Sequence, residues 1–224
     1  MKKVFIGVGH GGKDPGAVAI NGFKESHLNL RIALACQNLL AQHGVLTTIS
    51  RENDINKPLA ERIKECNSFA PDLALDIHNN AGGGNGAEVY HTYNGGKGKT
   101  LAENILTEIV AIGQNSRGTK TKLNESGKDY YGFIRSIAAP SVIVECAFLD
   151  NKDDLAIIDT EEDQTKMGYA IARGVLKTLG IKLNENNPKM YAVQVGAFTS
   201  RSNADVLLKQ LERAGFNGFI VEKG

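Results

Sequence analysis

Two histidines and two glutamates lie in sequence settings that are typical of functional residues. His10 and His78 each follow a short apolar run and precede a polar, glycine-rich segment. Glu145 interrupts an otherwise apolar run, and Glu25 opens a segment whose apolar residues recur at helical spacing. An ionised carboxylate in an apolar strand costs several kcal/mol unless it is paired or binds a metal, which favours a functional role for Glu145.

Two imidazoles and one carboxylate are the ligand set of a common type of catalytic zinc site, in which a fourth position stays open for water. Taken singly, each residue has an ordinary explanation. A histidine at a strand end is commonly a hydrogen-bonded structural residue, and an acidic residue stabilises a helix N-terminus. The combination favours a zinc site. The other histidines have no comparable setting, and we expect ordinary surface or helix-end positions for His27, His43 and His91.

The elements that would position these groups alternate along the chain. Short apolar runs predict strands at residues 4–8, 45–49, 73–77, 87–90 and 142–144. Helical spacing predicts helices between Leu28 and Gly44 and at residues 59–69, 100–112 and 165–179. This pattern predicts an α/β fold: a mostly parallel twisted sheet with helices on both faces, plus a small C-terminal β-α-β unit. Such sheets carry their chemistry at the carboxyl ends of the strands, so the four groups are expected to converge there.

The composition narrows the class of protein. With 26 basic and 25 acidic residues the net charge is +1, which does not favour nucleic acid or an anionic membrane through bulk electrostatics. The three cysteines are far apart and lack paired metal-type spacing, as is typical of a protein whose thiols stay reduced. We expect Cys36 and Cys66 to be buried as small apolar residues.

The start of the chain does not resemble a secretion signal. It begins Met1-Lys2-Lys3, but the apolar run that follows is shorter than the ~7–15 residues of a signal core. No later segment approaches the ~18 apolar residues of a membrane helix. We therefore expect a soluble chain that is made in the cytoplasm without a signal peptide.

Four stretches of the sequence resemble motifs of one enzyme family. In chain order they are GHGGKDPGA, GFKESHLNL, DIHNNAGG and YGFIRSIAAPSVIVECAFLDN. The resemblance, over about residues 3–180, is to the zinc-dependent N-acetylmuramoyl-L-alanine amidases of the Amidase_3 type, which cut peptidoglycan. In one departure, the family usually has Asp-Pro before the Gly-His pair, where this chain has Gly7 and Val8. Neither is a ligand position, so the departure concerns loop geometry and not the metal.

The resemblance implies a role for each candidate residue. Three residues would hold the zinc ion, namely His10, Glu25 and His78. Glu145 would be the catalytic glutamate. Asn80 would line the substrate pocket, and Arg135 would lie near the substrate, where it could pair with a carboxylate of the peptide stem. The bond cleaved would join the lactyl group of N-acetylmuramic acid to L-alanine.

The chemistry of amide hydrolysis matches this set of groups. Hydrolysis needs a polarised carbonyl, a nucleophile at neutral pH and a proton for the departing amine. Zinc would supply the first two, because it acts as a Lewis acid and lowers the pKa of bound water from about 15.7 towards about 7. Glu145 would take the proton of that water and pass it to the leaving nitrogen, a role typically worth ~10²–10⁴ in rate.

Two alternatives compete with the zinc enzyme. Cys146 could be the nucleophile of a cysteine amidase, paired with His78. Alternation along a strand opposes this, because Cys146 would point away from the face that Glu145 occupies. The second alternative is a metal-free module that binds the cell wall without catalysis. It leaves the acidic residue in an apolar strand unexplained.

The composition changes near the C-terminus. The polar stretch NENNPK predicts a linker at residues 183–189, between a catalytic domain at 1–182 and a small unit at 190–224. In that unit Tyr191 to Val195 alternate as in a strand, a helical pattern runs from Ala204 to Leu211, and residues 219–221 predict a second strand. The unit resembles one half of a SPOR-type peptidoglycan-binding domain, which usually has two such repeats.

A single ~35-residue β-α-β unit is small for independent folding, and its strands would have open edges. Pairing two copies about a twofold axis would give a four-stranded sheet, so we expect a homodimer through residues 190–224. The alternatives are a unit that binds the wall, or one that packs on the catalytic domain. An enzyme without a signal peptide would reach peptidoglycan after lysis or through a holin, as a phage endolysin or a mother-cell autolysin.

Overall fold

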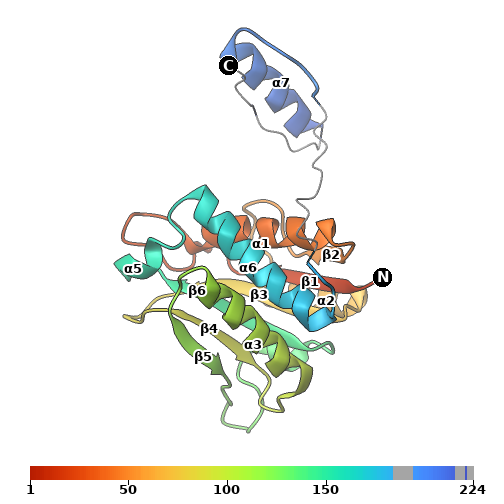
Figure 1. The fold of residues 1–224 in the computed structure, drawn as a ribbon, viewed down its shortest axis with the longest axis vertical. Coiled ribbons are helices and arrows are strands. Elements are labelled where there is room, and N and C mark those ends of the chain that lie inside the picture. The colour runs from red at the N-terminus through yellow and green to blue at the C-terminus, as the bar shows by residue number, and fades with distance from the viewer. Residues whose placement is uncertain (184–193, 215–219, 221–224) are drawn as a thin grey trace. The chain divides into compact units, whose positions relative to one another are not determined.

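The computed structural model describes residues 1–183, 194–214 and 220. The chain divides into two compact units, Met1–Glu185 and Asn186–Gly224. The first unit contains a six-stranded sheet with the strand order β2-β1-β3-β6-β4-β5 (Figure 1). The predicted linker at residues 183–189 lies almost wholly outside the described residues.

The first unit alternates strands and helices along the chain. Its strands are β1 Lys3–Val8, β2 Leu46–Ile49, β3 Leu73–Asn80, β4 Ala87–His91, β5 Ser116–Lys120 and β6 Ser141–Phe148. Its helices are α1 Glu25–Gln42, α2 Leu59–Phe69, α3 Gly96–Ala111, α4 Gly132–Ser136, α5 Lys152–Leu155 and α6 Glu161–Leu179. Neighbouring strands are parallel except β4 and β6, which pair antiparallel. The predicted mostly parallel α/β sheet is confirmed.

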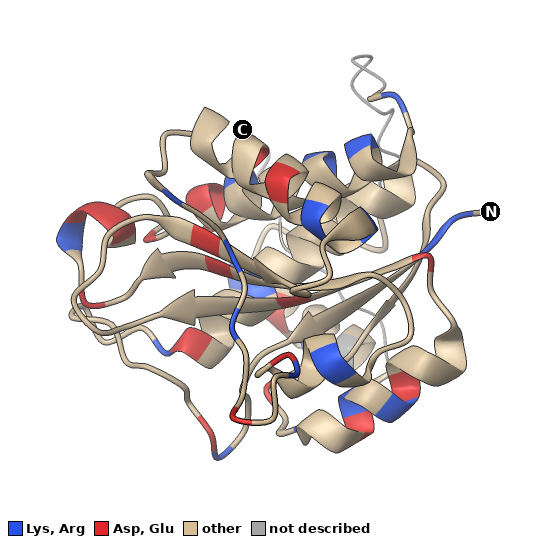
Figure 2. Ribbon diagram, turned by 90° about the horizontal axis from the view of Figure 1, so that it is seen from below, with Lys and Arg blue, Asp and Glu red and all other residues tan. Residues whose placement is uncertain are grey.

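Different helices cover the two faces of the sheet. Helices α1, α3 and α6 pack over one face, in the larger apolar core that includes Val4, Ile6 and Val144. Helices α2 and α4 contact the sheet at a smaller apolar cluster that includes Phe5 and Ile143. The strands are not wholly apolar, because Figure 2 shows charged residues on strands as well as on helices. Because successive residues of a strand point to opposite faces, one strand supplies core on one side and polar groups on the other.

Two strands extend further than the apolar runs predict. Strand β3 continues to Asn80 and β6 to Phe148, so His78 lies within its strand and not after it, and Glu145 does not end its strand. The pairing of β3 with β6 places His78 beside Glu145, and a register shift follows before Asn80. Backbone hydrogen bonds depend on the neighbouring strand and not on side-chain polarity, so β3 continues through the polar residues after Ile77, and β6 continues past Glu145 into the apolar residues Cys146 to Phe148.

Strand β5 is absent from the predictions. Its sequence, SRGTK, has no apolar residue, and it lies at the edge of the sheet beside β4. An edge strand that faces water needs few apolar side chains. For a related reason α3 begins at Gly96 rather than at residue 100, and α6 at Glu161 rather than at 165, since their first turns are polar.

The second unit is described in part. Helix α7, Arg201–Arg213, confirms the helix predicted there. The two predicted strands, at residues 191–195 and 219–221, lie mostly outside the described residues, and the described pair Gln194 and Val195 is not in a strand. Throughout the described part of the chain, every helix is too short or too polar to cross a membrane.

Candidate metal and catalytic site

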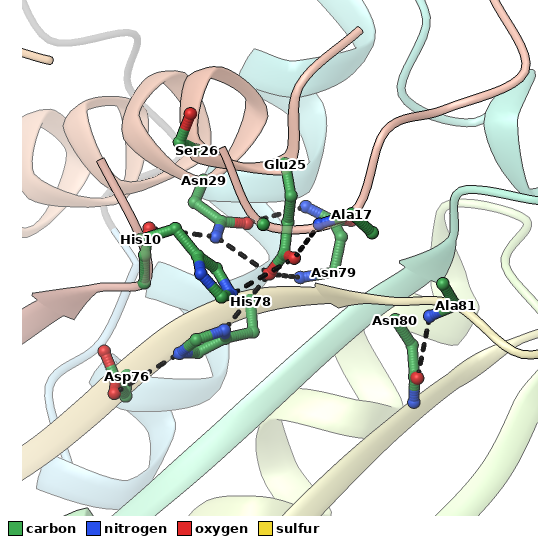
Figure 3. Close-up of polar contacts among 12 residues, drawn as sticks. His10, Ala17, Glu25, Ser26, Asn29, Asp76, His78, Asn79, Asn80 and Ala81 are labelled. Atoms are coloured by element: carbon green, nitrogen blue, oxygen red, sulfur yellow. Dashed lines mark hydrogen bonds and ion pairs between the residues drawn. The ribbon is translucent and has the colours of Figure 1, made fainter. Parts of the chain in front are cut away.

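His10 follows β1 in a left-handed backbone conformation, with a φ of 59°, which is uncommon for a residue other than glycine. Its Nδ1 lies 2.8 Å from Oδ2 of Asp14. Its Nε2 lies 3.2 Å from Oε2 of Glu25. The Asp14 contact therefore holds one nitrogen of the ring. The other nitrogen faces Glu25 (Figure 3).

Glu25 is the first residue of α1, and its side chain is buried. Its Oε2 accepts a hydrogen bond from the N–H of Ala17 at 3.0 Å. Its Oε1 accepts from Nδ2 of Asn29 at 3.1 Å and from the N–H of Asn79 at 3.2 Å. Gly16, with a φ of +66°, makes room for this carboxylate, because a Cβ atom there would lie 2.4 Å from Oε2. The loop and the helix start together fix the carboxylate.

His78 faces the same carboxylate from β3. Its Nδ1 lies 3.1 Å from Oε1 of Glu25, and its Nε2 lies 3.4 Å from Oδ2 of Asp76. Its ring meets the ring of His10 edge to face, with centroids 5.1 Å apart. Figure 3 shows His10, Glu25 and His78 pointing toward one another. One ligand atom from each lies within 4.8 Å of the others, so these three residues form a His₂Glu cluster.

The charges of this cluster favour a cation within it. Hydrogen bonding and charge from Glu25 raise the pKa of His10, against the effect of burial. Burial by itself would lower the pKa of His78, but Asp76 and Glu25 raise it to about 10. Burial also opposes ionisation of Glu25, yet its contacts with the two histidines hold its pKa far below the usual range. The ionised carboxylate of Glu25 is therefore stabilised by positive charge beside it. That charge is carried either by protons on the two imidazoles or by a cation bound in place of those protons.

Glu145 lies beside His78 on the neighbouring strand β6. Paired residues of adjacent strands point to the same face of a sheet, so the carboxylate adjoins the His₂Glu cluster. Its Oε2 is buried and has no hydrogen-bond partner among the described residues. Burial raises the pKa of Glu145 to about 7; the charge of His78 opposes this shift, and nearby carboxylates add to it. A carboxyl group with such a pKa can both accept and release a proton at neutral pH.

Asn80 and Arg135 both have partners within the chain. Nδ2 of Asn80 donates a hydrogen bond to Oε1 of Glu88 at 3.1 Å. Nη1 of Arg135 donates to the backbone carbonyls of Asp129 at 2.6 Å and Tyr130 at 2.7 Å. These bonds tie Arg135, in α4, to the loop before that helix. Contacts of Asn80 and Arg135 with substrate remain predictions.

Glu88 is a buried acidic residue that the sequence analysis missed. It lies in β4 opposite Glu145 and is 3% exposed. Its carboxylate accepts hydrogen bonds from Nε of Arg117 at 2.8 Å, from the hydroxyl of Tyr90 at 3.0 Å and from Nζ of Lys120. The signal that could have found it is an acidic residue inside the apolar run AEVY, the same signal that singled out Glu145.

Cys146 follows Glu145 in β6 and belongs to the larger apolar core, on the opposite face of the sheet. Burial raises the pKa of its thiol well above the ordinary value. A fully buried thiol in apolar surroundings is not a nucleophile, so the structure opposes the cysteine amidase. Cys36 and Cys66 are buried, as predicted.

Two of the three remaining histidines lie where they were predicted. His27 is exposed and lies 3.2 Å from Asp54, and His43 lies at the C-terminal end of α1. His91 is the exception, because it ends β4 and is only 6% exposed. The prediction of a surface or helix-end position for His91 was wrong because β4 is an inner strand, with β6 and β5 on its two sides.

Comparisons with known proteins agree with the motifs. The N-acetylmuramoyl-L-alanine amidase family (Amidase_3) matches residues 4–177, and the SPOR domain matches residues 170–222. The amidase CwlM of Bacillus licheniformis is 33% identical over 225 residues, which cover 99% of this chain and 85% of that protein. The sporulation-specific N-acetylmuramoyl-L-alanine amidase of Bacillus subtilis is 33% identical over 227 residues, which cover 100% of this chain and 86% of that protein.

Solved structures share the fold of the first unit. Cwp6 from Clostridium difficile matches with a TM-score of 0.78 and 39% identity, over 80% of this chain and 29% of that one. The catalytic domain of CwlV, an N-acetylmuramoyl-L-alanine amidase from Bacillus (Paenibacillus) polymyxa var. colistinus, matches with a TM-score of 0.73 and 29% identity, over 81% of this chain and 100% of that domain.

Proposed function

The chain belongs to the N-acetylmuramoyl-L-alanine amidase family and is a peptidoglycan hydrolase, and we propose that its activity depends on one zinc ion held by His10, Glu25 and His78. The bond that it hydrolyses joins the lactyl group of N-acetylmuramic acid to L-alanine of the stem peptide. The observation that most directly supports the zinc site is the convergence of side chains from three separate parts of the chain, with ligand atoms within 4.8 Å of one another.

The donor set fits zinc. Imidazole nitrogens and a carboxylate oxygen are typical of catalytic zinc sites, which use three protein ligands. The histidine nitrogens that face away from Glu25 lie beside further carboxylates. For His10 this is Asp14, and for His78 it is Asp76. Such outer carboxylates fix the tautomer and the direction of a metal-binding histidine. A zinc ion here would polarise the scissile carbonyl and make water a stronger nucleophile near neutral pH.

Glu145 is the residue to which we assign proton transfer. Its buried Oε2, which lacks a partner among the described residues, accepts a proton from the attacking water. The protonated carboxyl group then gives that proton to the nitrogen of L-alanine as the C–N bond breaks. The products are a lactyl carboxylate on the sugar and a free α-amino group on the peptide. In the metal-free protein burial raises the pKa of the Glu145 carboxyl group, which strengthens it as a base.

Digestion of purified peptidoglycan tests this function. The protein should contain one zinc per chain and should release new free amino groups on L-alanine, and a chelator should abolish the release until zinc is restored. Glu145→Gln should keep the zinc and lose turnover. A protein that binds cell walls but frees no amino groups would support the metal-free binding module instead, and loss of zinc in Glu145→Gln would make Glu145 a ligand.

For residues 190–224 we propose attachment to peptidoglycan and association of two chains. The SPOR match supports the first, because amidase and SPOR domains both point to peptidoglycan. The small size of the unit supports the second, since two copies could complete a sheet that one cannot. The place of action would then be the cell wall.

A further inference from the structure

Two glycines at the end of β1 lie beside two polar residues of the neighbouring strand β3. Gly7 is in register with Asp76, and the N–H of Gly9 donates to the carbonyl of Ile77, next to His78. A Cβ atom at Gly7 would lie 2.4 Å from Oδ1 of Asp76, and one at Gly9 would lie 2.2 Å from Cε1 of His78. Neither glycine has a positive φ, so backbone conformation does not require glycine at these positions. Glycine is required because a Cβ atom would overlap the side chains of Asp76 and His78.

Asp76 is held from a third element. It is 2% exposed, and Nη1 of Arg62 donates to its two carboxylate oxygens at 2.6 and 2.7 Å. Arg62 lies in α2 and is itself buried. On its other side, Oδ2 of Asp76 lies 3.4 Å from Nε2 of His78. Since an ionised carboxylate stays buried only when it is paired, α2 gives this one both its charge partner and its orientation.

We propose that Asp76 is a positioning residue for the metal centre. It lies in the space left by Gly7, and Arg62 fixes its carboxylate. That carboxylate turns His78 so that Nδ1 faces Glu25, where it would be a ligand of the metal. The inference rests on the zinc site proposed above. A carboxylate in this outer position typically changes metal affinity by about 10–100-fold.

The same contact gives a physical reason for the departure of this chain from the Asp-Pro-Gly-His pattern. Position 7, where that pattern has aspartate, is glycine here and lies within β1, so the expectation that the departure concerns loop geometry was wrong. The first side-chain carbon at position 7 would lie within 2.4 Å of the Asp76 carboxylate, so the two side chains compete for one space. In this chain the carboxylate in that space comes from β3.

The first test is Asp76→Asn, which keeps the shape of the side chain and removes its charge. The dissociation constant for zinc, measured by competition with a chromophoric chelator, should rise about 10–100-fold. The visible spectrum of the cobalt-substituted protein should change as well, because His78 loses its fixed direction. Asp72→Asn is the matched control, since Asp72 precedes β3 and pairs with Lys2, and it should change neither measurement.

The second test moves the carboxylate from β3 to β1. Asp76→Ala and Gly7→Asp should each weaken zinc binding, the first by removing the carboxylate and the second by crowding it. The double variant Gly7→Asp/Asp76→Ala should bind zinc more tightly than either single variant. If the single variants do not fold, recovery of a folded, zinc-binding protein in the double variant supports the inference in the same way.

Two results would overturn the positioning role. One is a folded Asp76→Asn protein with the wild-type zinc affinity and cobalt spectrum. The other is a double variant that does not fold or binds zinc no better than Asp76→Ala. A wild-type protein that binds neither zinc nor cobalt in these assays would instead refute the proposed metal site, so the two failures are distinguishable.

Discussion

The two faces of the central sheet differ in what the same strands place on them. Toward α1, α3 and α6 the strands present an apolar core, with Ile77 and Cys146 among its members. On the other face the residues next to these in sequence are His78 and Glu145. Near the ends of β3 and β6, one-residue alternation therefore places apolar core on one face and chemical groups on the other, although earlier in the same strands Ala74 and Ile143 belong to the smaller apolar cluster on the second face. The effect of a substitution should depend on which face its side chain occupies.

The largest expected difference is between His78→Ala and Ile77→Val. His78→Ala removes one of three proposed ligands, so zinc content and turnover should both fall to background. Ile77→Val should lower the free energy of unfolding by about 0.5–1.5 kcal/mol and leave zinc bound, because it only removes a buried methylene group. Metal analysis and denaturant unfolding of both proteins measure this. A His78→Ala protein that still binds zinc and is active would show that His78 is not a required zinc ligand.

Glu145→Gln should lower turnover by about 10²–10⁴ while zinc content stays at the wild-type level, because the glutamine keeps the size of the side chain and cannot accept the proton. Release of L-alanine amino groups from peptidoglycan, measured beside zinc content, separates the two effects. Turnover within tenfold of wild type would mean that another group transfers the proton.

The same substitution has a pH-dependent effect on stability in chelator-treated protein. The pKa of Glu145 is raised to about 7 in the folded protein from an ordinary value of 4.5, so its ionisation opposes folding as the pH rises through this interval. Glu145→Gln should therefore be more stable than wild type by about 1–3 kcal/mol at pH 8, with the gain absent near pH 4.5. Urea unfolding at both pH values measures it, and a gain of equal size at both would contradict the shift.

Cys146→Ser tests the apolar face. The hydroxyl would be buried in an apolar core, so the free energy of unfolding should fall by about 1–2 kcal/mol while turnover per folded molecule stays unchanged. Thermal unfolding and the peptidoglycan assay measure the two quantities on one preparation. Complete inactivation of a folded Cys146→Ser protein would revive the cysteine nucleophile.

The smallest effect on chemistry should follow from removing the second unit. A protein that ends at Leu183 keeps both faces of the sheet, so its turnover per zinc should match that of the full chain, while its retention on cell walls should weaken. Light scattering should show a monomer for the truncated protein and a dimer for the full chain. A full-length protein that remains monomeric at micromolar concentration contradicts the proposed dimer.

The sequence was informative wherever one residue departs from its local pattern. The acidic residue in the apolar run around Glu145 and the histidines after apolar runs were visible without any knowledge of strand order. Glu88 and Asp76 carried the same signal but were overlooked. Strand β5 carried none, because an edge strand made of SRGTK has no apolar pattern to detect.

What the sequence by itself determined was the set of elements and the types of chemical group near their ends, because apolar periodicity and burial costs act locally. The tertiary structure decided which groups meet. Asp76 stands inside the apolar run of residues 73–77, but nothing in the sequence pairs it with Arg62, because that contact depends on how α2 packs against the sheet. The space at Gly7 matters only because β1 and β3 pair in one register, and register is a property of two strands together.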